Sequence, residues 1–302
     1  MSGERLDGMD DTEDTEDTED RDATDGTDET DGDSSGERGD SERKSGFDDG
    51  AFVTSGGVRV PAVTAAAMRE VDRVAVEEVC LPLLSMMENA GRNLAKASRA
   101  VVGGQPRNAV VVAGGGGNGG GGLAGARHLE NHGTDVTVVL DRPREELEGA
   151  PAQQVNALSA TDATVVDGED AVQEGIEAVL DVDVVVDALV GYGLTDALDG
   201  TAGDLAQVID QGARRALSLD VPSGFDATTG DAPGRAVHPD ATLTLALPKT
   251  GLDAVPGDLL LGDIGIPAGV YERAGVPAPP PDVFGAAYVV ALAPADDDGS
   301  RS

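Results

Sequence analysis

Three stretches of this 302-residue chain run from an apolar, β-branched segment directly into glycine or a carboxylate. They are Val110 to Gly122 (VVVAGGGGNGGGG), Val184 to Gly191 (VVVDALVG) and Leu217 to Gly224 (LSLDVPSG). In an open parallel sheet, the carboxyl ends of the strands line the ligand crevice. The three endings therefore predict one site that is assembled from three distant segments.

The same alternation continues along the chain and predicts the fold class. Strands of a parallel sheet that is covered on both faces are nearly continuous apolar runs, separated by segments of helical period. We expect a doubly wound, mostly parallel sheet in a Rossmann-like three-layer α/β/α arrangement, as a single folded domain over 58–275. The expected strands are 109–113, 135–140, 163–166, 183–187, 215–219 and 241–246, and the expected helices lie near 120–132, 145–159, 169–180 and 201–212.

Two further helices are expected ahead of this alternation. Thr64 is a candidate N-cap for a helix whose apolar residues recur at helical spacing from Met68 to Val79. Pro82 then forces a break, and a second helix is expected from Leu83 to about Ala100.

The flanking segments have a different composition. Residues 1–57 include an Asp-Thr-Glu repeat with much Ser and Gly, which is typical of a disordered acidic tail. Residues 276–302 contain a proline-rich linker (VPAPPPD), an apolar run from Ala286 to Leu292 that is either a last edge strand or an apolar segment outside the sheet, and a second acidic tail.

The net charge of −36 is spread over the whole chain. Lysine occurs only at Lys44, Lys96 and Lys249, and there are four Phe, three Tyr and no Trp. This composition is typical of halophilic proteins from a cytoplasm with molar salt, where a Debye length of about 3 Å screens self-repulsion. It argues against nucleic acid as a partner, because phosphate binding needs a basic surface.

Other classes are excluded by single observations. Cys80 is the only cysteine, so an intrachain disulfide cannot form. No apolar run approaches the ~18 residues that a membrane helix needs. The N-terminal segment is acidic and lacks the apolar stretch of a secretory signal. We expect a cytoplasmic protein with no membrane partner.

The first glycine-rich turn satisfies the dinucleotide-binding pattern G-x-G-x-x-G through Gly114, Gly116 and Gly119. The next strand ends in Asp141, where a dehydrogenase places its ribose-binding acid, so an NAD(P)-dependent oxidoreductase is one alternative. Against it, no catalytic base with an activating partner can be placed. Each histidine is more simply interpreted as a residue without a catalytic role: His128 and His132 on a helix surface and His238 in a loop.

Polar side chains distinguish the three strand endings from ordinary turns. Asn118 follows the first strand and can cap the next helix, or its amide oxygen can ligate a hard cation. Asp187 and Asp220 each follow an apolar strand directly, with Ser223 three residues after the second. Either carboxylate alone could hold a turn together. Two of them at neighbouring strand ends, facing a polyglycine loop, favour a ligand site.

The order of these motifs resembles the NAD(P)H-hydrate epimerase family, the YjeF N-terminal domain, over roughly 60–270. The motifs that carry the resemblance are Thr64-Ala-Ala-Ala-Met-Arg69, Met87-Glu-Asn-Ala-Gly-Arg92, Gly116 to Leu123 with Ala126-Arg-His-Leu129, Asp187-Ala-Leu-Val-Gly-Tyr-Gly-Leu194, Leu219-Asp-Val-Pro-Ser-Gly224, Pro248-Lys249 and Gly262-Asp-Ile-Gly-Ile-Pro267.

The resemblance implies a repair enzyme that interconverts the R and S forms of hydrated NADH and NADPH (NADHX and NADPHX). A dehydratase specific for the S form would then restore the coenzyme; it is often fused in this family, and here we expect it to be a separate protein. A homodimer is a further expectation. The implied substrate-binding residues are Gly117, Asn118, Gly119, Gly120, Gly121, Gly191, Tyr192, Gly193, Leu194 and Asp220.

By the same resemblance, Asn118, Asp187 and Ser223 would bind one potassium ion per subunit, and Asp220 would be the catalytic acid/base. A carboxyl group there could protonate the leaving hydroxyl beside the ring nitrogen and later take a proton from water that adds to the other face. Lys249 could assist Asp220 or pair with it for structural reasons alone.

The glycine-rich loop departs from the family pattern, which usually reads N-N-G-G-D. The first Asn and the Asp are replaced by Gly117 and Gly121, which removes a hydrogen-bond acceptor and one negative charge near the substrate. A catalytically silent nucleotide-binding or interaction module with the same fold is therefore a second alternative.

Overall fold

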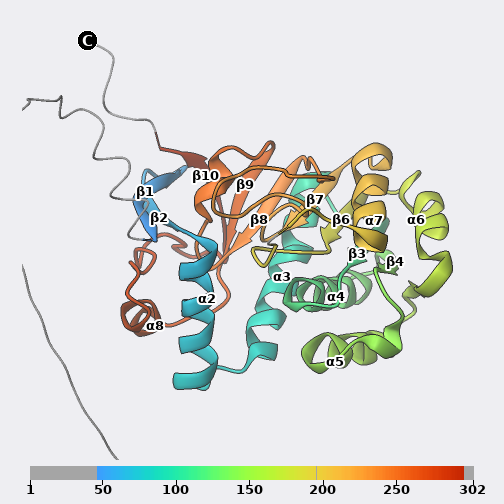
Figure 1. Ribbon diagram of the computed structural model, residues 1–302, viewed down its shortest axis with the longest axis horizontal. Helices are drawn as coiled ribbons and strands as arrows, with labels where there is room; N and C mark the ends of the chain where they lie inside the picture. Colours follow the sequence, from blue (N-terminus) through green and yellow to red (C-terminus); the bar gives the residue numbers. More distant parts are fainter. Residues whose placement is uncertain (1–45, 195, 296–302) are drawn as a thin grey trace, which may run out of the picture. The chain divides into compact units, whose positions relative to one another are not determined.

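A ten-stranded mixed sheet organises the computed structural model, which describes residues 46–194 and 196–295 (Figure 1). The strand order is β2-β1-β10-β9-β8-β7-β6-β3-β4-β5. The strands are β1 Phe47–Thr54, β2 Arg59–Val63, β3 Asn108–Ala113, β4 Asp135–Leu140, β5 Thr164–Val166, β6 Val184–Ala188, β7 Ala216–Leu219, β8 Ala241–Leu245, β9 Asp258–Gly262 and β10 Val289–Pro294.

Pairing divides this sheet into two parts. From β9 to β5 every neighbouring pair is parallel. At the other end β10, β1 and β2 are added antiparallel. Each of the six strands expected from the sequence is present in the parallel part. The mostly parallel α/β fold is therefore confirmed.

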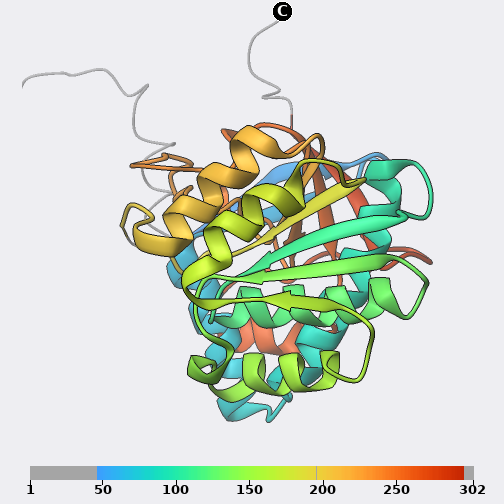
Figure 2. The ribbon, with the colours of Figure 1, turned by 90° about the vertical axis from the view of Figure 1, so that its right-hand side faces the viewer.

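Helices cover both faces of the parallel part (Figure 2). The residues of β3 show how: Val111 packs with the core under one group of helices, whereas Val110 and Val112 pack with the core under the other. A strand buried on both faces must be apolar at every position, which explains the continuous runs. One face carries α3 Leu83–Val102, α4 Gly117–Glu130 and α5 Gly149–Leu158, and the other carries α6 Ala171–Val179 and α7 Gly200–Gly212.

The two helices predicted ahead of the parallel strands are present, with the predicted N-cap at Thr64 and the predicted break at Pro82. The Thr64 hydroxyl accepts a hydrogen bond from the Ala67 amide at 3.2 Å and caps α2 Ala65–Arg73. A π-helical turn, Val74–Glu78, prolongs this helix. Pro82 then precedes α3.

Both flanking segments differ in part from the structure that their composition predicts. Residues 47–54, expected within the tail, form β1, whose Phe52 is fully buried. The segment Asp48-Asp49-Gly50 has the composition of the tail, which conceals the strand. The strand expected near 286–292 is β10, but it lies between β1 and β9 rather than at an edge. The rest of the two predicted tails, 1–45 and 296–302, lies outside the described residues.

The domain therefore extends beyond the expected 58–275. Short elements that the sequence analysis did not foresee complete it: β2, β9 and α8 Ala268–Arg273. Together with α2 they enclose a separate core around Phe52, Val71 and Tyr271.

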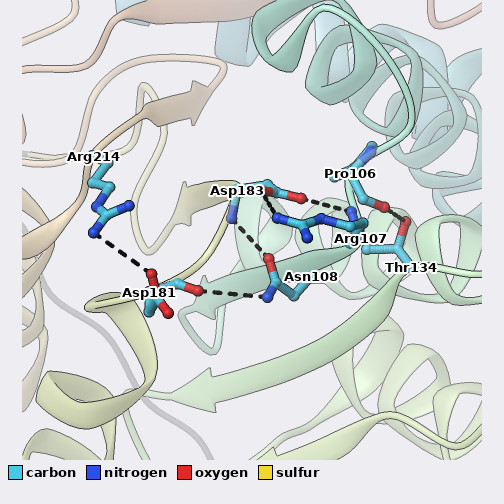
Figure 3. A network of polar contacts seen from close by, with 7 residues as sticks. All are labelled: Pro106, Arg107, Asn108, Thr134, Asp181, Asp183 and Arg214. Atoms are coloured by element: carbon cyan, nitrogen blue, oxygen red, sulfur yellow. Dashed lines mark hydrogen bonds and ion pairs between the residues drawn. The ribbon is translucent and has the colours of Figure 1, made fainter.

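A polar network ties together the amino ends of the central strands (Figure 3). The Asp183 carboxylate accepts a hydrogen bond from the Arg107 amide at 2.8 Å, and the Asp183 amide donates to the Asn108 side chain at 2.9 Å. The Thr134 hydroxyl donates to the Pro106 carbonyl at 2.9 Å. These contacts fix the loops that precede the central strands to one another. They lie at the amino ends of the strands, opposite the carboxyl ends where the three predicted site segments are found. Among the helices described, none has the length and apolar character needed to cross a bilayer.

Candidate active site

A cavity of about 450 Å³ lies at the carboxyl ends of the parallel strands. The three segments identified from the sequence meet there, through the loops that follow β3, β6 and β7. Further walls come from α2, α3 and the loops after β4 and β8. The lining includes Met68, Asp72, Met87, Gly115, Gly116, Gly117, Asn118, Gly121, Asp141, Arg142, Val190, Gly191, Tyr192, Gly193, Asp220 and Lys249.

Asp220 follows β7 in the left-handed backbone region, with φ of 67°. This conformation is unfavourable for a residue with a side chain and requires support from its surroundings. The support is visible: the Asp220 amide donates to the Leu243 carbonyl at 2.7 Å, and its carboxylate accepts from the amides of Tyr192 and Leu245, each at 3.3 Å. The strained turn therefore holds the carboxylate at the cavity wall.

Lys249 is buried beside Asp220, with a side chain 1 % exposed. Its ammonium group donates to the Asp220 carboxylate, to the Leu245 carbonyl at 3.0 Å and to the Thr244 hydroxyl at 3.4 Å. An ammonium has three donors, so all of them are satisfied. Lys249 thus places a fixed positive charge against Asp220, and its part in proton transfer stays a prediction.

Asp187 lies behind the cavity wall and is fully buried. Its carboxylate accepts hydrogen bonds from the Ser218 hydroxyl at 2.8 Å, from the Ser223 hydroxyl at 2.5 Å and amide at 2.9 Å, and from the Leu189 amide at 3.3 Å. Burial nevertheless raises the pKa of Asp187, because the four donors do not offset the loss of solvent. The site holds a buried carboxylate that a nearby cation would stabilise.

Gly191 shows that two of the predicted residues converge. A Cβ atom there would lie 3.0 Å from an Asp220 carboxylate oxygen and 3.2 Å from the Asn118 amide oxygen. The Asn118 amide nitrogen is buried and makes no hydrogen bond within the described residues. The Ser223 hydroxyl accepts from the neighbouring Val190 amide at 3.0 Å. Asn118, Asp187, Asp220 and Ser223 therefore surround one segment, 189–191.

These oxygen donors fit a hard cation. They comprise one buried carboxylate, one amide oxygen and one hydroxyl, a type of set that suits ions such as potassium rather than zinc. In the described part of the chain, no group of three or more His, Cys, Asp and Glu residues could hold a metal ion. A cation here would depend on neutral oxygens together with the single charge of Asp187.

The glycine-rich loop is closely packed at some of its positions and open at others. A Cβ atom at Gly121 would lie 3.0 Å from a Leu219 methyl group and 3.7 Å from the Ala90 Cβ atom, so a side chain there would require Leu219 to shift. A Cβ atom at Gly119 would lie 1.7 Å from the Gly114 carbonyl oxygen, which makes glycine obligatory. Gly117 is exposed, and its nearest neighbour would be a Met87 methyl group at 4.0 Å.

Asp72, which was not among the predicted site residues, reaches the cavity from α2. Its carboxylate accepts a hydrogen bond from the Tyr192 hydroxyl, and burial raises the pKa of Asp72. Burial and the adjacent Asp72 charge raise the pKa of Tyr192 in turn. Asp72 lies one turn after the buried Met68 on α2. A carboxylate on the apolar face of a helix was therefore the feature of the sequence that could have indicated a site residue.

Some predicted residues do not line the cavity. Leu194 packs instead against the core under α6 and α7. Gly119 and Gly120 are buried and shape the loop through its backbone. None of the three histidines lines the cavity: His128 contacts Glu88 at 2.8 Å, and His238 contacts Asp210 at 2.9 Å.

This arrangement of loops agrees with a known family. A family model described as "YjeF-related protein N-terminus" matches residues 83–251, more than half of the chain. The chain belongs to this family. The matched range contains the glycine-rich loop and ends just after Lys249.

Curated relatives extend the similarity to most of the chain. The NAD(P)H-hydrate epimerase of Dehalogenimonas lykanthroporepellens is 44% identical over 74% of this chain and 90% of its own length. That of Rhodopirellula baltica is 30% identical, over 72% and 90% respectively. The bifunctional NAD(P)H-hydrate repair enzyme Nnr of Moorella thermoacetica is 36% identical over 68% of this chain, which spans only 40% of that relative.

The crystal structure of the yeast protein ynu0 shares the fold. It matches with a TM-score of 0.61 at 23% identity and covers 72% of this chain and 94% of the yeast chain. At this identity the likeness supports the YjeF N-terminal fold alone.

Proposed function

We propose that the protein is an NAD(P)H-hydrate epimerase, an isomerase that interconverts the R and S forms of NADHX and NADPHX. The observation that carries this function is the 44% identity to a curated epimerase along 90% of that enzyme. The cavity agrees with it, because Asp220 faces a space bounded by a glycine-rich loop. No histidine lines this space, so a histidine base for hydride transfer, which the oxidoreductase alternative could use, is not present there.

Asp220 is the proposed acid/base. The carbon to be inverted carries a hydroxyl group and adjoins the ring nitrogen. In its protonated form Asp220 gives a proton to the hydroxyl oxygen, the C–O bond breaks with its electron pair on oxygen, and water leaves while the nitrogen lone pair forms a C=N bond. The resulting Asp220 carboxylate lies close to the ring cation and stabilises it.

Water then adds to the opposite face of this planar cation. Its oxygen forms the new C–O bond, the C=N electrons return to nitrogen, and the excess proton returns to Asp220. The net reaction changes only the configuration at one carbon. Lys249 keeps its three hydrogen-bond acceptors and supplies a constant positive charge that positions the Asp220 side chain.

Potassium is the proposed ion at the second cluster. Asn118, Asp187 and Ser223 would hold it, and its charge would offset the buried Asp187 carboxylate and order the loops after β3, β6 and β7. Asp187→Ala should raise the potassium concentration needed for full activity. Turnover measured in KCl and in NaCl at equal ionic strength tests this, and equal activity of the unaltered protein in both salts contradicts it.

A separate dehydratase specific for the S form is the proposed functional partner. Bifunctional relatives carry a longer chain, of which this one matches about 40%. The homodimer, the cytoplasmic location and the halophilic character stay predictions from sequence. A thermal melt that is identical in dilute buffer and in molar KCl would contradict the last of these.

One experiment decides between the epimerase and the catalytically silent module. R-form hydrate is mixed with an S-specific dehydratase, with and without this protein, and return of the reduced nicotinamide absorbance is followed. If the protein is an epimerase, the dehydratase should consume all of the hydrate, and it should do so much faster than spontaneous epimerisation alone allows. An unchanged time course rejects the proposal.

A further inference from the structure

The strand order gives the cavity a direction. Its lining continues past Asp220 to Leu245 and Lys249, and along the carboxyl ends of β7, β6, β3 and β4 one stretch of it extends from Asp220 at one end to Asp141 and Arg142 at the other. Neighbouring strands lie about 4.8 Å apart, so three spacings separate the two ends by roughly 14 Å. This length suits a whole dinucleotide whose hydrated ring lies at Asp220.

The middle of the cavity lies at the N-terminus of α4. Gly116 and Gly117 are exposed there and line the cavity, so their backbone can approach a pyrophosphate. In doubly wound folds the ribose of the second nucleoside then lies at the end of the next strand. That strand is β4, and the residues that follow it are Asp141 and Arg142.

Arg142 is the accessible member of this pair. Its guanidinium donates to both Asp141 carboxylate oxygens, through Nε at 2.8 Å and Nη2 at 3.1 Å. The Asp141 side chain is 7% exposed and that of Arg142 is 45% exposed. The Asp141 carboxylate is thus held by Arg142 and is mostly covered. Arg142 also lines the cavity, and its only hydrogen bonds to described residues are the two that Nε and Nη2 make with Asp141.

Gly115 fixes where the guanidinium lies. A Cβ atom on Gly115 would approach Arg142 Nε to 2.5 Å and Cζ to 2.6 Å. The guanidinium therefore lies directly against Gly115 of the glycine-rich loop, next to the proposed pyrophosphate position. At this place in such folds an acid accepts from a ribose 2′-hydroxyl, whereas an arginine accommodates a 2′-phosphate.

We propose that Arg142 binds the 2′-phosphate of NADPHX, so that the protein prefers NADPHX to NADHX. Asp141 is the positioning residue that orients the guanidinium. The inference rests on the proposed function for its substrate, but the binding geometry can be tested without turnover.

The binding test uses ADP-ribose and 2′-phospho-ADP-ribose, which lack the hydrated ring, in calorimetric titrations at one ionic strength. The 2′-phosphate should tighten binding about tenfold or more, on the scale of a charge-assisted hydrogen-bond pair. Arg142→Gln should bring the ratio of the two affinities close to one.

Two companion variants separate a local contact from general electrostatics. Arg144→Gln removes the same charge two residues away, where the side chain bonds Asp167 and the Val165 carbonyl and does not line the cavity. It should keep the preference. Gly115→Ala keeps every charge but displaces the flexible end of Arg142, and it should lose the preference as Arg142→Gln does.

The outcomes are distinguishable. Equal affinities in the unaltered protein, or an equal loss of preference in Arg144→Gln, overturn the role of Arg142. The same ratio should appear in kcat/KM for the two hydrates. If neither hydrate is epimerised while the 2′-phosphate is still preferred, the proposed function fails and the binding inference stands.

Discussion

The parallel and antiparallel parts of the sheet contribute differently to the site. The parallel part provides Asn118, Asp187 and Asp220 from the loops after its strands. The antiparallel part provides none of these three side chains, but it positions two other residues that line the cavity, Lys249 and Asp72. The Val63 amide at the end of β2 donates to the Pro248 carbonyl at 2.9 Å, next to Lys249, and α2 carries Asp72 directly from β2 into the cavity.

In this doubly wound sheet, the polar side chains of the site follow the parallel strands. The added antiparallel strands position further residues around those side chains and close the site. Variants in the two parts should therefore fail in different ways. Those at the parallel strand ends should lose turnover, and those in the antiparallel part should lose stability.

The largest effect is expected for Asp220→Asn. Epimerisation should fall by about two to four powers of ten, because the acid/base is lost while asparagine tolerates the left-handed backbone. The coupled assay with R-form hydrate and dehydratase measures this. Near-normal turnover would remove Asp220 from the mechanism.

Its control addresses the buried charge that remains. Asp220→Asn leaves Lys249 without its carboxylate, and a buried unpaired charge is destabilising. The double variant Asp220→Asn with Lys249→Met should recover stability but not turnover. Recovery of both stability and turnover would show that Asp220→Asn loses activity only because it destabilises the fold.

Next comes Phe52→Ala in the antiparallel part. Truncating a fully buried phenylalanine should cost about 3–5 kcal/mol of unfolding free energy. Urea unfolding followed by circular dichroism should show a single transition at lower urea, because β1 joins β2 to β10 within one sheet. A second, separate transition would mean that the two parts fold independently.

A matched glycine pair tests the loop of the parallel part. Gly119→Ala should destabilise the protein by about 3 kcal/mol and abolish activity, since its Cβ atom would overlap the Gly114 carbonyl. Gly117→Ala, in open space, should change the unfolding free energy by less than about 0.5 kcal/mol. Equal effects in chemical denaturation would refute this description of the loop.

The smallest effect concerns pH. Burial raises the pKa of Asp72 above its usual 3.8, so the folded state binds this proton more tightly than the unfolded state. Its contribution to stability is complete below that value and is lost as pH rises through the raised pKa. Relative to the unaltered protein, Asp72→Asn should gain stability as the pH rises above 3.8 and through the raised pKa of Asp72. Melts with a constant difference across that range would contradict the shift.

Sequence patterns predicted the parallel part well because double-sided burial imposes continuous apolar strands, as in β3 and β6. The convergence of Asn118 with Asp220 followed from the rule that parallel strands end at one edge. β1 was concealed by its acidic composition, and the interior position of β10 depends on pairing with a strand more than two hundred residues away. Asp72 required knowledge of how α2 packs, and the tight fit at Gly121 depends on a Leu219 methyl group that no local pattern reveals.

The pairing of β1 with β10 also sets the order in which the enzyme can be completed during synthesis. The ribosome makes the β1–β2 hairpin first, but its place in the sheet opens only once the last strand has emerged. Until then the nascent chain can form its parallel core, whereas β1 lacks the strand that joins it to the rest of the sheet. The sheet that holds β1 should therefore be complete only after β10 has been synthesised.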